Sequence, residues 1–499
     1  MRIASLVSFG FAWIVTAICA APPIRLHPDN PRWFEWRGQA TALITSAEHY
    51  GAVLNLDFDA RRYLETLQRD GMNYTRIFAG TYVEPPGAFG IQRNTLAPAT
   101  GRFLAPWARS DQPGYAGGGH KFDLDGFSPE YLARLKSFIG EAGQRGVVVE
   151  LTLFCATYNE KQWSLHPLNP ANNIQSLKVS EWRKLNTLPP GTSPEEACAA
   201  SPVFAVQESL VRWLVRELNG FDNLFYEIQN EPWADNRLPG EVINPYLLDR
   251  QTWPNAVEIP TAETVAWQRA IARVIADEEN RLPNRHLIAQ NVANFRLALN
   301  DGDLVPEASI VNFHYAYAEA AEWNRGLNRV IGCDETGFAG REDAHYRRQA
   351  WRFLLSGGGL LNNLDYSFTV GHEDGGDTAN QAPGGGSPAL RRQLKDLSDF
   401  LHRFDLARLH PDPLLVARAP GVVTHALSDP GQAHAIYVQG RSPTTLTLNL
   451  AAGSWTVEWI SVEDGRVLRR ETVVAKAGEA CALASPGFPD AVAVRILPN

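Results

Sequence analysis

The feature that most constrains the fold is a regular alternation of short apolar runs with segments of helical spacing. Several of the runs are apolar on consecutive residues, as expected for parallel strands that are buried on both faces. The eight runs span residues 42–46, 74–78, 147–154, 224–230, 286–291, 309–314, 330–335 and 359–365. Between them, Ser128-Pro129 and Ser387-Pro388 mark helix starts, each with a capping residue followed by a first-turn proline. This order predicts an α/β fold of the (β/α)8 TIM-barrel type.

The pattern changes near residue 409. His410-Pro-Asp-Pro413 reads as a boundary, and only strand-like runs separated by turn signals follow it. These runs lie at 433–438, 444–450, 455–460 and 491–496. The sequence therefore predicts a barrel over residues 21–409 and a small all-β sandwich over residues 410–499.

The first twenty residues resemble a secretory signal peptide. A basic Arg2 precedes an apolar run, and small residues at Ala20-Ala21 offer a cleavage site before Pro22. The alternative is an uncleaved membrane anchor, because the run is near the lower length limit for a span. We expect a secreted or periplasmic protein with no stable membrane association after signal cleavage.

Charge and cysteine content limit the partners. The net charge is -9 and no run of Lys and Arg is present, which argues against a nucleic-acid partner. Beyond the signal, the cysteines are Cys155, Cys198, Cys333 and Cys481. Export permits a Cys155–Cys198 disulfide that closes one long loop, with free buried thiols as the alternative. No Cys-x-x-Cys or His-x-His pattern occurs, so we expect neither a metal site nor a cofactor.

Two carboxylates end strands of the predicted barrel. Pro232 cannot continue a central strand, so Asn230 and Glu231 must lie at the carboxyl end of the fourth strand. Glu335 ends the seventh strand in the same way. Catalytic residues of such barrels lie at this rim, and glycosidic bond cleavage usually needs two carboxyl groups. The sequence cannot measure their separation, which decides between retention and inversion.

These residues resemble the signature of clan A glycoside hydrolases, and family 5 cellulase-like enzymes are the nearest family. The resemblance covers about residues 42–409 and rests on Asn230-Glu231-Pro232 with Glu335. It implies retaining hydrolysis, with Glu231 as acid/base and Glu335 as nucleophile. It also implies that Asn230 holds the 2-hydroxyl of the sugar and that Arg76 hydrogen-bonds the nucleophile and keeps it ionised.

Two strands depart from the family pattern. The sixth usually shows His-x-Tyr, but here it reads His314-Tyr315-Ala316-Tyr317, which leaves open whether Tyr315 or Tyr317 approaches the nucleophile. The eighth typically presents a tryptophan, and Tyr366 stands in that region instead. The exact family and the sugar therefore stay open.

Strand alternation raises two further questions. Glu335 follows Asp334, and its placement on the same face as Ile331 and Cys333 favours Glu335 as the site acid. Strict alternation would instead separate Asn230 from Glu231, so both can serve the site only if the strand bulges or bends there.

Other rim residues are candidates for binding the substrate. Trp233 follows the acid/base closely and is expected to stack on a sugar, whereas His314 is either a site residue or a core histidine. Glu48 and His49 end the first strand, where they either contact substrate or stay structural.

The leading hypothesis is a secreted retaining glycoside hydrolase that cleaves O-glycosidic bonds of a polysaccharide or oligosaccharide by double displacement. One alternative is a carbohydrate-binding protein on a barrel that has lost catalysis. Another is a metal-dependent hydrolase, which would need His-x-His after the first strand, where Glu48-His49-Tyr50 stands instead.

Overall fold

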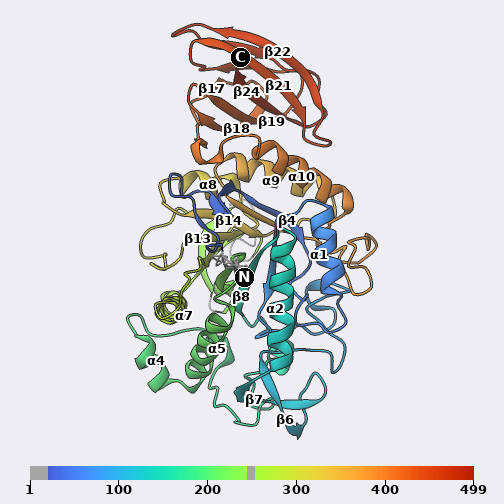
Figure 1. Ribbon diagram of the computed structural model, residues 1–499, viewed down its shortest axis with the longest axis vertical. Helices are drawn as coiled ribbons and strands as arrows, with labels where there is room; N and C mark the ends of the chain where they lie inside the picture. Colours follow the sequence, from blue (N-terminus) through green and yellow to red (C-terminus); the bar gives the residue numbers. More distant parts are fainter. Residues whose placement is uncertain (1–20, 236, 244–252) are drawn as a thin grey trace, which may run out of the picture.

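The computed structural model describes residues 21–235, 237–243 and 253–499 (Figure 1). Its centre is an eight-stranded parallel sheet with hydrogen-bonded order β4-β15-β14-β13-β12-β9-β8-β5. The strands are β4 (Leu43–Ala47), β5 (Tyr74–Phe78), β8 (Val148–Cys155), β9 (Leu224–Asn230), β12 (Ile288–Asn294), β13 (Ile310–His314), β14 (Val330–Glu335) and β15 (Leu360–Leu364). Each predicted run forms one of them, so the predicted TIM barrel is confirmed.

The barrel closes between β4 and β5 through a side chain. The amide of Asn73, just before β5, donates to the carbonyl of Ala42 and accepts from the N–H of Ile44, both at 2.8 Å. At the other end of these strands, the N–H of Phe78 donates to the carbonyl of Tyr50 at 3.2 Å. The side chain of Asn73 thus satisfies backbone groups of β4 that a paired strand would otherwise satisfy.

Helices cover the outside of the barrel (Figure 1). The longer ones are α1 (Ala60–Arg69), α2 (Pro129–Gln144), α5 (Pro202–Leu218), α7 (Ala262–Glu279), α9 (Asp343–Leu355) and α10 (Pro388–Leu401). Both predicted Ser-Pro starts are present, because Ser128 accepts from the N–H of Tyr131 and Ser387 accepts from the N–H of Leu390. These caps satisfy N–H groups that have no partner within the first helical turn.

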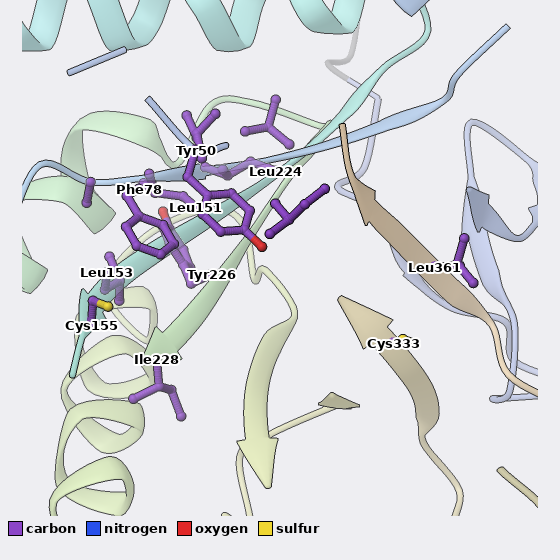
Figure 2. Close-up of a cluster of buried hydrophobic side chains, with 14 of the residues drawn as sticks. Tyr50, Phe78, Leu151, Leu153, Cys155, Leu224, Tyr226, Ile228, Cys333 and Leu361 are labelled. Atoms are coloured by element: carbon purple, nitrogen blue, oxygen red, sulfur yellow. The ribbon is translucent and has the colours of Figure 1, made fainter. Parts of the chain in front are cut away.

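Alternate strand residues belong to the main hydrophobic core. Figure 2 shows Leu151, Leu153 and Cys155 projecting from β8, with Tyr226 and Ile228 on the neighbouring β9. Most of the residues that alternate with them are polar and buried, namely Glu150, Thr152, Glu227 and Gln229, whereas Phe154 is apolar. The strands therefore carry apolar and polar residues in alternation, and the polar set continues toward the rim.

An apolar plug closes the opposite end of the barrel. A three-stranded sheet of β1 (Arg25–Leu26), β2 (Phe34–Trp36) and β3 (Gln39–Thr41) supplies Phe34. Its ring stacks on Phe225 with centroids 6.3 Å apart, and Phe225 stacks on Tyr74 at 6.2 Å. These residues form a separate buried cluster near the strand starts, opposite the carboxyl rim.

The C-terminal residues form two antiparallel sheets around an apolar core, as predicted for a sandwich. The larger sheet contains β16 (His410–Pro411), β18 (Val422–Asp429), β19 (Ala433–Gly440), β24 (Ala491–Pro498), β21 (Gly453–Ser461) and β22 (Val467–Ala475). The smaller one contains β17 (Val416–Arg418), β20 (Thr445–Leu448) and β23 (Cys481–Ala484). The domain limits of 21–409 and 410–499 stay a prediction.

The sandwich packs on the barrel through α9 (Figure 1). The ring of Trp351 stacks on Tyr437 with centroids 5.7 Å apart. Arg348 donates to Asp490 at 2.7 Å and Arg352 donates to Gln439 at 2.8 Å. Apolar stacking and charged contacts together fix the larger sheet beside the helix.

The part of the chain that the structure describes contains no helix long and apolar enough to cross a membrane. The predicted signal peptide, residues 1–20, lies outside the described residues. Cys155 and Cys198 are free thiols, so the disulfide that the sequence left open does not form here. The amide of Asn230 contacts the sulfur of Cys155 at 3.4 Å, and the thiol of Cys198 lies beside Glu208.

Candidate active site

Glu231 and Glu335 face each other at the barrel rim. Glu335 ends β14 and Glu231 directly follows β9. One carboxylate oxygen of each lies within 4.8 Å of the other and of a ring nitrogen of His314. The hydroxyl of Tyr315 spans the gap, 2.6 Å from Glu335 Oε1 and 3.4 Å from Glu231 Oε1. The two strand-end carboxylates that the sequence singled out therefore share one site.

A backbone bend places Glu231 beside Asn230. Glu231 has a φ of 48°, in the left-handed region that costs an L-residue roughly 1–2 kcal/mol. Its N–H donates to Oδ1 of Asn291 at 3.2 Å, which helps to hold the bend. Tyr158 then contacts both side chains, donating to Glu231 Oε2 at 2.7 Å and accepting from the amide of Asn230 at 3.0 Å. The sequence predicted that Asn230 and Glu231 could serve one site only if the strand bulges or bends there, and Glu231 provides that bend.

The carboxylate of Glu335 is surrounded by hydrogen-bond donors. Tyr50 donates to Oε2 at 2.8 Å, Tyr315 donates to Oε1 at 2.6 Å, and Arg76 approaches Oε2 at 3.4 Å. Burial by itself raises the pKa of Glu335, but the charge and hydrogen bond of His314, together with Arg76 and Tyr315, lower that pKa below its usual range. Glu335 is therefore held as a carboxylate, the form that a nucleophile needs.

Arg76 is fully buried and joins several strands. It makes two hydrogen bonds of 2.6 Å to Glu227 and one of 2.8 Å to Oδ1 of Asn230. Its contact with Glu335 is longer, at 3.4 Å. Arg76 is thus both a buried ion-pair partner of Glu227 and a cationic neighbour of Glu335.

His314 lies between the carboxylates and is fully buried. Its Nδ1 is 3.1 Å from Glu231 Oε1 and 3.5 Å from Glu335 Oε1, and its Nε2 is 3.4 Å from Asp334 Oδ1. Burial lowers the pKa of His314, but Glu335 and Asp334 raise it well above the ordinary value. We infer an imidazolium that compensates part of the negative charge at the site.

Asp334 and Glu335 have different surroundings, and the sequence argument used to separate them was wrong. Phe313 pairs with Cys333 but His314 pairs with Glu335, so the register shifts by one residue at Asp334. Asp334 is fully buried, accepts from the amide of Asn291 at 2.9 Å and lies 3.4 Å from Arg76. Burial raises the pKa of Asp334 to about 6. The register shift, and not simple alternation, lets Glu335 reach the pocket.

The two glutamates line a small pocket of about 220 Å³. Many of its lining side chains are aromatic, and we call one set of them the aromatic collar. It consists of Phe89, Tyr158, Trp253, Tyr315 and Phe338. Polar groups line the inner wall, among them His49, whose Nε2 lies 3.4 Å from Glu84. His49 Nδ1 is buried without a hydrogen-bond partner among the described residues.

Other predicted substrate residues lie outside this pocket. Trp233 is 1% exposed and packs edge-on against His314 with centroids 5.1 Å apart, so it supports the histidine and has no free face for a sugar. Glu48 is fully buried and accepts from two backbone N–H groups at 2.9 Å, which makes it structural. Tyr366 lies behind His49, with ring centroids 5.8 Å apart. Tyr317 stands farther out beside Phe295, so Tyr315 is the tyrosine that approaches the nucleophile.

Sequence reasoning missed several pocket residues. Tyr50 and Tyr158 follow the first and third strands by only three residues each, so their place at the rim was a usable signal. Phe89, Trp253 and Phe338 come from loops whose course the sequence does not reveal. Trp163 and Trp182, in the long loop after β8, stack on each other and do not line the pocket.

The site also has residue types that bind metals, in two groups. These are Glu231, His314 and Glu335 at the rim, and Glu150, Glu227 and Asp334 deeper in the barrel. Their oxygens are largely engaged by protein donors, for example Glu227 by Arg76 and by Thr152 at 2.8 Å. The arrangement is that of a hydrogen-bonded network around Arg76. The expectation of a metal-free site stays a prediction.

No protein-family model and no curated protein matches this sequence. Solved structures do match. A glycoside hydrolase family 5 structure from Bacteroides vulgatus ATCC 8482 has a TM-score of 0.59 at 12% identity, covering 95% of this chain and 93% of that chain. A second structure, described as a glycoside hydrolase, has a TM-score of 0.59 at 12% identity, covering 96% and 97%. The chain therefore shares the fold of family 5 glycoside hydrolases over most of its length.

Proposed function

We propose that this protein is a glycoside hydrolase that cleaves O-glycosidic bonds of an oligosaccharide or polysaccharide with retention of configuration. The observation that carries the proposal is the pair of rim carboxylates, Glu231 and Glu335, with oxygens within 4.8 Å in one pocket. Retaining enzymes place their carboxyl groups about 5–5.5 Å apart, whereas inverting enzymes leave about 6.5–9.5 Å for a water molecule. The spacing favours the retaining reaction.

In this reaction Glu335 attacks the anomeric carbon and Glu231 protonates the leaving oxygen. The low pKa of Glu335 and its hydrogen bonds from Tyr50 and Tyr315 support the nucleophilic role. Glu231 is held toward the same point by Tyr158 on one oxygen and by His314 on the other. Water then attacks the glycosyl-enzyme, and Glu231 accepts its proton.

The pocket chemistry supports a sugar as the substrate. Aromatic rings of the collar offer faces for the C–H groups of a sugar ring. His49, Glu84 and Asn230 offer polar groups for hydroxyls. Asn230 is positioned by Arg76 and Tyr158, which is consistent with a role in holding the 2-hydroxyl.

Hydrolysis of a panel of polysaccharides and aryl glycosides tests the proposal. Wild type is compared with Glu231→Ala and Glu335→Ala, and Glu65→Gln on the exposed side of α1 is the control. Loss of cleavage in both site variants, with the control unchanged, supports the function. Cleavage that survives in both site variants rejects the assignment. A wild type that binds sugars on an affinity gel but cuts none would favour the alternative of an inactive carbohydrate-binding protein.

We also propose that the protein is secreted or periplasmic after removal of residues 1–20. The basic start, apolar run and small residues of that segment support this location. Fractionation of producing cells, with the N-terminus of the recovered protein read by mass spectrometry, tests it. An intact N-terminus in the membrane fraction would favour an anchor instead.

A further inference from the structure

The first of two loops that bind each other lines the pocket, through Glu84, Phe89 and Leu96. One loop follows β5 and the other follows β15, the two strands next to β4 in the barrel. Arg93 of the first loop donates to both oxygens of Asp377 in the second loop, each at 2.5 Å. The backbone of Gln92 donates to the carbonyl of Gln381 at 2.8 Å, and that of Arg93 donates to Asn380 at 3.0 Å. These bonds hold the first loop, which carries Phe89, against the second.

The first loop also reaches across the mouth. Phe89 packs edge-on against Tyr158 with centroids 5.0 Å apart and against Phe338 at 6.5 Å. Phe338 contacts Tyr315 at 5.7 Å and Trp253 at 6.0 Å. The collar thus runs from the loops after β5 and β8 to the loop after β14. It leaves only about 220 Å³ around Glu231 and Glu335, below the range of roughly 300–1,000 Å³ typical of ligand pockets.

A second, much larger hollow begins at the same collar. It has a volume of about 980 Å³ and shares Trp253, Tyr315 and Phe338 with the catalytic pocket. Its far wall belongs to the C-terminal sandwich, through residues 423–425 of β18 and Gln439 of β19. We call this hollow the interdomain groove. It lies between the shared aromatic residues of the collar and the sandwich domain.

The groove has the surface of a site for a chain of sugars. Trp253 and Tyr317 are each 37% exposed, so their rings are partly free for stacking. Polar side chains lie among them, including Gln349 and Arg352 from α9. Arg352 donates to Gln439 across the groove at 2.8 Å, which fixes the two walls relative to each other.

We propose that the enzyme acts from the non-reducing chain end, with one terminal sugar in the pocket and the leaving sugars in the interdomain groove. The inference rests on the proposed function. A substrate cut internally needs room for sugars on both sides of the scissile bond, but Phe89 lines one side, on a loop that the Arg93–Asp377 contact holds. Each turnover breaks one C1–O bond, consumes one water and releases one monosaccharide.

Product analysis tests the direction of attack on whichever polymer or oligosaccharide series the wild type cleaves. Chromatography of the earliest products should give one monosaccharide and a chain shortened by one unit, and the viscosity of a polymer should fall slowly. A mixture of internal fragments from the first turnovers would overturn the inference and leave the hydrolase function intact. If Glu231→Ala and Glu335→Ala still cleave, or if no substrate is cut, the proposed function fails and the inference fails with it.

Two matched valine variants test the groove. Val423→Trp fills the groove from β18, whereas Val474→Trp adds the same ring to an exposed site on β22 that does not line it. We expect Val423→Trp to lower the ratio of kcat/KM for long over short leaving groups about tenfold. Val474→Trp should leave that ratio unchanged. An unchanged ratio in a folded Val423→Trp protein would place the leaving sugars elsewhere.

Discussion

The phenol of Tyr315 donates to Oε1 of Glu335 at 2.6 Å from a backbone position with a φ of 52°. The neighbouring Tyr317 stands outside the catalytic pocket. A positive φ is uncommon for an aromatic residue, and such strain persists only where the surroundings enforce it. In this chain the strain brings a donor to the carboxylate that the proposed mechanism requires to be ionised.

Tyr315→Phe should lower kcat about 10- to 100-fold, because a hydrogen bond to a charged group contributes roughly 1.5–3 kcal/mol. The acidic limb of kcat/KM should move to higher pH, since Tyr315 helps to lower the pKa of Glu335. Steady-state kinetics over a pH series measure both effects. Tyr115→Phe is the control, because its hydroxyl donates only to the carbonyl of Leu165, away from the pocket. A pH profile that stays in place would show that Tyr315 does not tune Glu335.

Trp233→Phe separates two roles for this tryptophan. Because Trp233 is buried against His314, we expect a fall in kcat and a loss of stability with little change in KM. A smaller ring leaves part of a cavity, and complete removal of such a side chain costs about 3–5 kcal/mol. Kinetics and thermal unfolding measured on one preparation test this. A rise in KM with kcat unchanged would instead support the sugar stacking that the sequence had suggested.

Asp334→Asn should lower the pKa of His314, because the charges of Glu335 and Asp334 raise it. A histidine with a raised pKa in the folded state stabilises the fold fully below its unfolded value of about 6.5, and this contribution is lost as the pH rises through the folded pKa. In the variant, this contribution should therefore be smaller, and its loss should be complete at a lower pH. Denaturant unfolding across pH and NMR titration of the imidazole measure it. The control Asp277→Asn, on the exposed face of α7, should change neither the pKa of His314 nor the pH dependence of the unfolding free energy.

The eight barrel strands were predictable because their outward-facing residues pack into the apolar core, as Leu151 and Leu153 do. The rim glutamates were predictable because a strand that ends on Glu231-Pro232 must present its last polar residues at the carboxyl end. The polar layer inside the barrel could not be predicted. Glu150 and Glu227 are single charges inside apolar runs, and only the closed barrel brings them near Arg76.

The contacts between the rim loops could not be predicted from the sequence either. The collar depends on contacts between loops far apart in the chain, such as Phe89 with Phe338 and Arg93 with Asp377. No local pattern encodes these contacts. The shift in register at Asp334 is a further case, because it depends on how β14 pairs with β13 and not on the composition of either strand.

Chemical rescue assigns the two carboxylates separately. In Glu335→Ala, azide can occupy the space of the lost carboxylate and attack the anomeric carbon once, which should yield a glycosyl azide of inverted configuration. In Glu231→Ala, Glu335 remains, so a substrate with a good leaving group should form the glycosyl-enzyme. Azide then replaces water and gives a product of retained configuration. NMR of the anomeric proton distinguishes the two products.

If Glu335→Ala gave the product of retained configuration and Glu231→Ala gave the inverted product, the roles of the two glutamates would be exchanged. A failure of azide to rescue either variant, with both folded, would argue against a covalent intermediate. The geometry favours Glu335 as the nucleophile and Glu231 as the acid/base. Glu335 is held by Tyr50, Tyr315 and Arg76 in the ionised form, whereas Glu231 sits on a strained turn with Tyr158 and His314 directing it toward the same point. An ionised group fixed by several donors suits attack on carbon, and the carboxyl group facing it is placed to deliver the proton.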